Sequence, residues 1–432
     1  MAKHLMKYGE QEFSVNLDED CIACELESNT VSLPQRTARE HVDYALDHPI
    51  GSPRLEEIVK PGQTVCIVAP DATRLWQSPH VYIPAVVERL NACGVLDAHI
   101  HILTATGSHR SMTREEHMAI VSEDIYKRIP VVDHVCTDSK NMVKAGVTSH
   151  GTEVWFNRLA MESDHIVLTG GVVYHFLAGY GGGPKYMLPG IASYETIQRH
   201  HNLALNKGFG SGSNPAVRSA NLTRDNVFHT DLEEAALLGR PSFLLNVVVD
   251  EQYNIIKAVA GDMVKAHREA CALVDAIDGV PVAGRTPLVI ASAGGAPKDI
   301  NFYQTIKTLA NALAVVEEGG TIILLSACTE GFGSKDTEHQ IRDFASMEAR
   351  EKDLRAHFSI GSYVGFLFAE SAEKYHLILV CAMPEEAFAK TGIHVTRTLD
   401  EALALARRLN NGNGRLRATL LPHGANTLPK LA

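Results

Sequence analysis

The stretch HIVLTGGVVYHFLAGYGGGPKYMLPGIASYETIQRHHN, residues 165–202, decides how this chain is expected to fold. It begins with an apolar run, His165–Thr169, that predicts a buried strand, and it continues into a glycine-rich turn followed at once by Lys185. The turn contains three consecutive glycines, Gly181, Gly182 and Gly183. In α/β proteins a strand that ends in such a turn lets the backbone approach an anionic ligand closely. The stretch therefore predicts a ligand site on an α/β scaffold.

Histidines lie on both sides of this turn. His175 precedes the glycines, and the pair His200 and His201 follows a helix start predicted at Ser193. Imidazoles move protons near neutral pH or bind metals. Because neighbouring side chains on a helix point in different directions, we expect only one of the pair to face the site.

Strand-like apolar runs recur along the chain, and most end in a polar or glycine-rich turn. They cover residues 64–69, 98–104, 165–169, 287–292, 321–326 and 376–380. Stretches with helical periodicity lie between them, such as Tyr82–Cys93, Asp231–Leu238 and Ile306–Glu318. This alternation predicts an α/β protein with largely parallel sheets, in which ligands bind beyond the carboxyl ends of the strands.

At 432 residues the chain is too long for one hydrophobic core. The best boundary is DGVPVAGRTP, residues 278–287, which is rich in Gly and Pro and precedes a new strand. We therefore expect an N-terminal α/β lobe at residues 1–280 and a C-terminal α/β lobe at residues 281–410. The tail at residues 411–432, which begins within NNGNG (residues 410–414), is expected to complete the first lobe.

Composition narrows the class of protein. A formal net charge of −11 argues against a general nucleic-acid binder and against an anionic membrane surface. No apolar run reaches the roughly 18 residues that span a bilayer, and the N-terminus lacks a signal-peptide core. Eight scattered cysteines predict reduced thiols and a cytoplasmic location. The pair Cys21 and Cys24 has no second CxxC to complete a zinc site.

Chemically capable residues follow other predicted strands. Asp71 and Arg74 come after the first strand, and an Arg fork there suits a carboxylate or phosphate. His109 follows the second strand within TGSH, as His175 follows the third. Two imidazoles from separate loops can face one substrate from opposite sides. Either histidine taken alone is equally consistent with a structural, hydrogen-bonded side chain.

A second candidate group lies beyond residue 298, where a helix is predicted after a Gly-Gly turn. Tyr303 and Lys307 are four residues apart and Gln304 and Lys307 three apart, so all three are neighbours on a helix. Such a group can hold a carboxylate. It is equally consistent with a solvated helix face.

Taken in order, these motifs resemble the nickel-dependent lactate racemase family. The resemblance runs from DATR (71–74) through TGSH (106–109) and HFLAGYGGGPKYMLPGIAS (175–193) to YQTIK (303–307). It implies two α/β lobes with an active-site cleft between them. It also implies a nickel-pincer nucleotide, a pyridinium-3-thioamide-5-thiocarboxylic acid mononucleotide, bound covalently to a lysine.

Carried over by position, the resemblance implies a role for each residue. Lys185 would form the covalent link, His201 would bind the nickel, and His109 and His175 would be the acid–base pair. Asp71, Arg74 and the three glycines would contact the cofactor. The substrate carboxylate would be held by Arg74, Tyr303, Gln304 and Lys307.

The reaction implied is inversion at C2 of a 2-hydroxy acid by reversible hydride transfer to the cofactor. The only tryptophans are Trp76 and Trp155, so the second-lobe tryptophan of lactate-specific members is missing, and we expect a substrate other than simple lactate. The expected partners are this small molecule and the proteins that build the cofactor.

Two other interpretations remain open from the sequence. One is a zinc-type metallohydrolase with His109, His175 and His201 as ligands, which would leave Lys185 unmodified. The other is a non-catalytic protein that binds an anion or a nucleotide.

Overall fold

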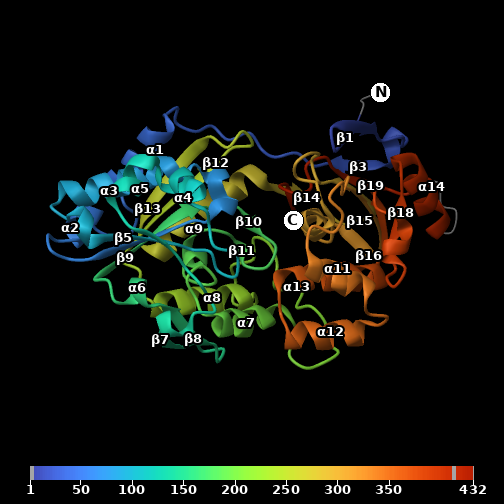
Figure 1. Ribbon diagram of the computed structural model, residues 1–432. Coiled ribbons are helices and arrows are strands. Elements are labelled where there is room, and N and C mark those ends of the chain that lie inside the picture. Colours follow the sequence, from blue (N-terminus) through green and yellow to red (C-terminus); the bar gives the residue numbers. More distant parts are fainter. Residues whose placement is uncertain (1–3, 411–414, 432) are drawn as a thin grey trace. The chain divides into compact units, whose positions relative to one another are not determined.

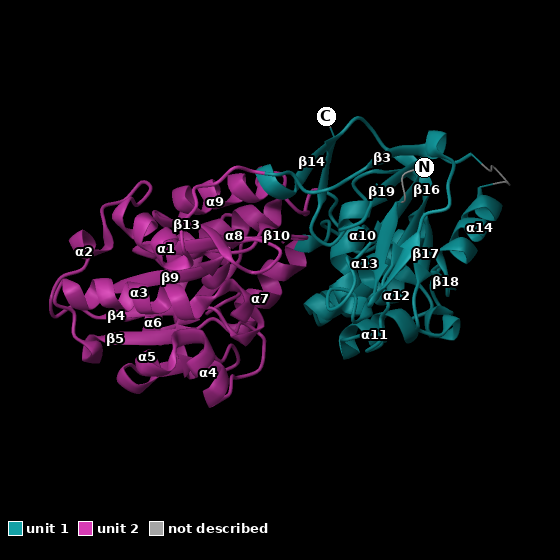
Figure 2. Ribbon diagram, turned by 90° about the horizontal axis from the view of Figure 1, so that it is seen from above, with its two compact units in different colours: residues 1–30, 204–215, 276–432 teal, residues 31–203, 216–275 magenta. Residues whose placement is uncertain are grey.

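The computed structural model describes residues 4–410 and 415–431, which form two compact units (Figures 1 and 2). Unit 2 contains Val31–Leu203 and Ala216–Asp275. Unit 1 contains the segment up to Thr30, the short segment Ala204–Pro215 and the chain from Ala276 onward. Each unit is built around its own six-stranded sheet, so the predicted α/β class with largely parallel sheets is confirmed.

The sheet of unit 2 is a mostly parallel one. Its strands lie in the order β13 (Ile255–Gly261), β12 (Phe243–Val249), β9 (His165–Gly171), β4 (Val65–Ala69), β5 (Ile100–Thr104) and β6 (Val131–Asp133). Only the β12–β13 pair is antiparallel. All five residues of β4 are buried, as expected for a parallel strand that is covered on both faces.

Helices supply the apolar side chains that bury this sheet. Five of them pack into one core cluster on it, namely α1 (Ala38–Asp47), α2 (Leu55–Ile58), α3 (Pro79–Ala92), α4 (Arg114–Val121) and α5 (Glu123–Arg128). The others are α6 (Arg158–Met161), α7 (Tyr194–His201), α8 (Val227–Leu238) and α9 (Met263–Asp278). Within the described part of the chain, no helix has both the length and the apolar character needed to cross a membrane.

The sheet of unit 1 is parallel throughout. Its strands lie in the order β18 (His394–Thr396), β17 (His376–Val380), β16 (Val316–Leu325), β15 (Thr286–Ser292), β19 (Ala418–Leu421) and β3 (Ile22–Glu25). Its helices are α10 (Ile306–Ala312), α11 (Lys335–Arg342), α12 (Met347–Ala356), α13 (Ile360–Lys374) and α14 (Leu399–Leu409). The apolar face of α14, with Leu399, Leu403 and Ala406, packs into the core on one face of this sheet.

Short elements complete the two units. Two-stranded pairs are β1 (Leu5–Tyr8) with β2 (Gln11–Ser14), β7 (Met142–Val147) with β8 (Glu153–Asn157), β10 (Tyr174–His175) with β11 (Gly179–Tyr180), and β14 (Gly279–Val282) with β20 (Leu428–Leu431). The 3₁₀ helices are η1 (Glu19–Cys21), η2 (Ala72–Gln77), η3 (Asp97–His99), η4 (Ser139–Asn141), η5 (Gly183–Tyr186), η6 (Asn202–Ala204), η7 (Phe302–Thr305) and η8 (Glu385–Phe388).

Both ends of the chain differ from the predicted domain division. We expected residues 1–280 and the tail 411–432 to form one lobe, but β3 and β19 are strands of the unit 1 sheet. All four residues of β19 are buried, and the strand pairs with β15 on one side and with β3 on the other. Its hydrogen-bonding partners are therefore strands of unit 1. Residues 411–414 of the predicted boundary lie outside the described residues.

One predicted helix is shorter than expected. The helical periodicity of Ile306–Glu318 predicts a single helix, but α10 ends at Ala312 and β16 begins at Val316. Val315 and Val316 are β-branched and buried, which favours the extended conformation once the chain reaches the sheet.

Asn226 connects α8 to the loop that follows His175. Its side chain is fully buried, and its Oδ1 accepts the backbone N–H of His229 at 3.0 Å, which caps the helix. Its Nδ2 donates to the carbonyls of Leu177 and Asn221, both at 2.9 Å. One amide thus satisfies a helix terminus and two backbone carbonyls where water is excluded.

We expect Asn226→Ala to lower the free energy of unfolding by about 2–3 kcal/mol, because it removes a cap and leaves buried backbone groups unpaired. The matched control is Thr37→Ala, which removes the exposed cap of α1 and should cost about 1 kcal/mol. Urea unfolding followed by circular dichroism measures both. Equal losses in the two variants would show that the buried bonds of Asn226 add nothing.

Candidate active site

The candidate residues of unit 2 follow three adjacent strands of its sheet. Strands β9, β4 and β5 are neighbours, and their carboxyl ends lie at the same edge because they run parallel. Asp71 follows β4, His109 follows β5 and His175 follows β9. The loops that carry these three residues therefore lie at one edge of the sheet.

Asp71 orients the ring of His109. The carboxylate is 5% exposed, and its Oδ2 lies 2.5 Å from His109 Nδ1, while Thr73 Oγ1 donates to its Oδ1 at 2.6 Å. Burial favours the neutral acid, but the hydrogen bonds from His109 and Thr73 outweigh it and lower the pKa of Asp71. The carboxylate accepts the Nδ1–H of His109, so the lone pair of a neutral ring is on Nε2. That exposed ring is suited to accept a proton.

Arg74 brings positive charge to the same loop. Its Nη1 donates to Thr73 Oγ1 at 2.9 Å, and Thr73 in turn donates to Asp71. The guanidinium is one cause of the lowered pKa of Lys185, second to burial. A guanidinium in this place can pair with a carboxylate or phosphate.

Lys185 lies beside His175. Its Nζ is 3.0 Å from His175 Nε2, and burial together with Arg74 lowers its pKa to about 7. On the other side of the imidazole, Nδ1 accepts the backbone N–H of Leu177 at 3.2 Å and of Ala178 at 3.1 Å. The lysine expected to carry a covalent group and one histidine of the expected acid–base pair are thus in direct contact.

Two buried polar side chains, Asn246 and His267, bind the glycine turn. Neither is among the site residues predicted from the sequence. Asn246 Oδ1 accepts the N–H of Gly183 at 2.8 Å, and His267 Nε2 donates to the carbonyl of Gly181 at 2.8 Å. A Cβ at Gly183, where φ is +50°, would lie 2.5 Å from the ring of His267. A lone amide in the apolar strand FLLNVVV and a histidine on the buried face of α9 were the available signals.

His200 and His201 on α7 have different hydrogen-bond partners. His200 Nε2 donates to the carbonyl of Phe228 at 2.8 Å, and its Nδ1 lies 3.3 Å from His201 Nδ1. His201 Nδ1 donates to the carbonyl of Ile197 at 2.8 Å, which puts the lone pair of that ring on Nε2. Burial lowers the pKa of His200 to about 4 and that of His201 well below its ordinary value. Both rings are therefore neutral, as a metal ligand must be.

The predicted carboxylate group belongs to unit 1. Tyr303 and Gln304 lie on η7 and are partly exposed, and Lys307 lies exposed in the first turn of α10. Asn301 caps η7 by accepting the N–H of Gln304 at 3.1 Å. The predicted helix start after the Gly-Gly turn is confirmed.

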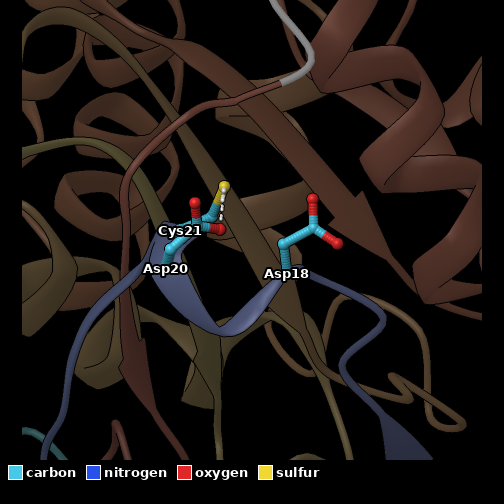
Figure 3. Close-up of side chains that lie close together, drawn as sticks. All are labelled: Asp18, Asp20 and Cys21. Carbon is cyan, nitrogen blue, oxygen red and sulfur yellow. Dashed lines mark hydrogen bonds between the residues drawn. The ribbon is translucent and has the colours of Figure 1, made fainter.

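One further cluster of possible ligands lies elsewhere in unit 1. Asp18, Asp20 and Cys21 are, among the residues that the structure describes, the only three His, Cys, Asp or Glu side chains with ligand atoms within 4.8 Å of one another (Figure 3). The two carboxylates are exposed, and Asp20 pairs with Arg415 at 3.0 Å. Cys24 instead contacts Thr419 Oγ1 at 3.6 Å. Among the described residues, Cys24 is therefore not part of this group.

Comparison with known proteins covers almost the whole chain. Residues 8–212 match the lactate racemase N-terminal domain and residues 283–428 the lactate racemase C-terminal domain. A lactate racemase from Lactiplantibacillus plantarum is 32% identical over 98% of this chain and 99% of that protein. One from Thermoanaerobacterium thermosaccharolyticum is 30% identical over 99% of each chain.

Solved structures agree with the sequence matches. The lactate racemase apoprotein from T. thermosaccharolyticum has a TM-score of 0.88 at 28% identity, covering 99% of this chain and 100% of that one. A protein from Thermotoga maritima, at 18% identity and a TM-score of 0.60, shares the fold alone. The resemblance seen in the sequence motifs is therefore confirmed over nearly the full length. The chain belongs to the lactate racemase family.

Proposed function

We propose that this chain is a racemase or epimerase that inverts C2 of a 2-hydroxy acid, with a nickel-pincer nucleotide tethered to Lys185 and its nickel bound by His201. Family membership supports racemase activity. The observation that carries the finer proposal is the contact of Lys185 Nζ with His175 Nε2 at 3.0 Å, at the sheet edge that also holds Asp71 and His109.

The residues present fit this group. Lys185 is a half-buried amine with a lowered pKa, suited to form a covalent bond. His201 is a neutral imidazole with its lone pair on Nε2. When bound, the group would supply the hydride acceptor and donor for C2, chemistry that no side chain provides.

The chain's own residues would then move the proton of the substrate hydroxyl. His109 accepts it on Nε2, and Asp71 stabilises the resulting imidazolium through Nδ1. His175 presents its Nε2–H to the substrate oxygen from another loop. Arg74, Tyr303, Gln304 and Lys307 bind the substrate carboxylate in this proposal, and the three glycines and Asp71 contact the cofactor. We propose a 2-hydroxy acid other than simple lactate as substrate, on the missing second-lobe tryptophan.

The zinc-hydrolase alternative has less support. It needs His109, His175 and His201 to offer ligand atoms to one ion, and they do not form such a group among the described residues. His175 instead uses both ring nitrogens, one with the backbone and one with Lys185.

Lys185→Ala should abolish covalent attachment, because no amine remains at the site. The protein is coexpressed with the family's cofactor-building enzymes and nickel, and intact mass and metal content are measured. Wild type and the control Lys127→Ala, at an exposed ion pair, should carry the adduct with nickel. An adduct in Lys185→Ala would refute the tether. Unmodified wild-type chain with zinc would favour the hydrolase, and unmodified metal-free chain the binding protein.

His109→Ala should reduce racemisation by a factor of about 10²–10⁴ while leaving the adduct in place, because the ring takes a proton and holds no cofactor. The control is His80→Ala, an exposed histidine of the same unit. Polarimetry of single 2-hydroxy acid enantiomers measures the rate, and mass spectrometry measures the adduct. A near wild-type rate in His109→Ala would rule this residue out as the acid–base group.

His201→Ala should lose nickel but keep the adduct mass, since the tether and the metal ligand are different residues. His200→Asn should keep nickel, because both nitrogens of His200 are already used by Phe228 and His201. Metal analysis after dialysis separates the two variants. Nickel loss in His200→Asn with retention in His201→Ala would reverse the assignment.

A further inference from the structure

The backbone fixes the protonation state of His175. Nδ1 accepts two backbone N–H groups, from Leu177 at 3.2 Å and from Ala178 at 3.1 Å. A nitrogen that accepts hydrogen bonds carries no proton, so the proton of the neutral ring is on Nε2. The imidazolium form would leave Nδ1–H facing two other N–H donors. His175 is therefore a donor at Nε2.

This assignment has a consequence for Lys185. Its Nζ lies 3.0 Å from Nε2, and an N–H donor needs a lone pair as its partner. Only a neutral amine offers one, whereas an ammonium would place protons against a proton. Among the described residues, His175 on β10 contacts Lys185, and Arg74 on η2 and His200 and His201 on α7 interact with it electrostatically. None of these four groups is an anion, and burial and Arg74 both disfavour the ammonium.

We propose that His175 prepares Lys185 for its own modification: the Nε2–H of His175 holds the amine neutral and in place, so the chain itself supplies the nucleophile that forms the tether. This inference rests on the proposed function only for the identity of the group attached. It gives His175 a positioning role in maturation, before any turnover.

The covalent step also changes His175. The Nζ lone pair turns from Nε2–H to the carbon of an acylating group, a C–N bond forms, and the bond from that carbon to its leaving group breaks. One amine proton leaves with the leaving group. An acylated nitrogen has no basic lone pair, so the Nε2–H of His175 loses this acceptor and becomes available to the substrate. The same N–H thus serves attachment first and catalysis afterwards.

Acetic anhydride tests the nucleophile without any cofactor. It acetylates an amine and releases acetic acid, which takes up the amine proton. Short pulses between pH 5.5 and 10.5 on the unmodified full chain, followed by peptide mass spectrometry, give the reactivity of each lysine. We expect Lys185 to reach half its maximal rate near pH 7, against roughly 10.4 for an ordinary exposed lysine. The exposed Lys127 in the same digest is the internal reference.

Two variants separate donation from mere packing. His175→Ala should raise the midpoint by about one pH unit or more, because the amine loses its donor. His175→Gln keeps an N–H near the Nε2 position and should stay within about half a unit of wild type. His109 makes no hydrogen bond to Lys185 among the described residues, so the midpoint in His109→Ala should match that of wild type. A wild-type midpoint close to that of Lys127, or one unchanged in His175→Ala, would overturn the proposal. So would a glutamine variant that behaves like alanine.

A second measurement needs no variant. Nitrogen-15 NMR of histidine-labelled wild type should show the proton of His175 on Nε2, and a proton on Nδ1 would overturn the proposal. These results are also independent of the proposed function. If Lys185 is reactive near pH 7 with a midpoint that depends on His175 but coexpression yields no adduct, the tether of the proposed function fails. The part of this inference that then stands is that His175 holds the Lys185 amine neutral. If the adduct forms but the midpoint does not depend on His175, the function stands and this inference fails.

Discussion

The site of unit 2 depends on a turn that has room only for backbone. At Gly183 a Cβ would collide with the ring of His267, and at Gly182 it would lie 2.7 Å from Val172 Cγ2. This close packing, with Asn246 and His267 bonded to the turn, fixes where η5 begins and hence where Lys185 projects. The glycines are thus required by the packing beneath them, whatever ligand lies above.

Three histidines of one chemical type are made different by what each Nδ1 contacts. Asp71 accepts from Nδ1 of His109 and the Ile197 carbonyl from Nδ1 of His201, so each of those rings has a lone pair on Nε2. Backbone N–H groups donate to Nδ1 of His175, so that ring has a proton on Nε2. The neighbours of Nδ1 therefore leave a lone pair on Nε2 of His109 and His201 and a proton on Nε2 of His175.

The sequence predicted the strands that position the site well, because buried parallel strands are apolar runs that end in polar or glycine-rich turns. It failed where long-range pairing decided the outcome. The tail at residues 411–432 is expected on the first lobe, yet β19 lies between β15 and β3 in the sheet of unit 1. The helix predicted from Ile306 extends beyond the observed end at Ala312, because β-branched residues after Ala312 join the sheet. Asn246 and His267 were missed because they look like ordinary residues of a strand and a helix until the turn packs on them.

By itself the sequence determined the fold class, the family and the order of Asp71, His109, His175, Lys185 and His201, since these depend on local periodicity and on motifs that are read in order. Only the tertiary structure decided which nitrogen of each imidazole holds a proton and that Lys185 faces His175 rather than an anion. It also decided that β19 lies between β15 and β3 in the sheet of unit 1. The physical reason is the same in each case. Hydrogen bonds and burial join residues that are distant in sequence, and local sequence patterns do not predict such partners.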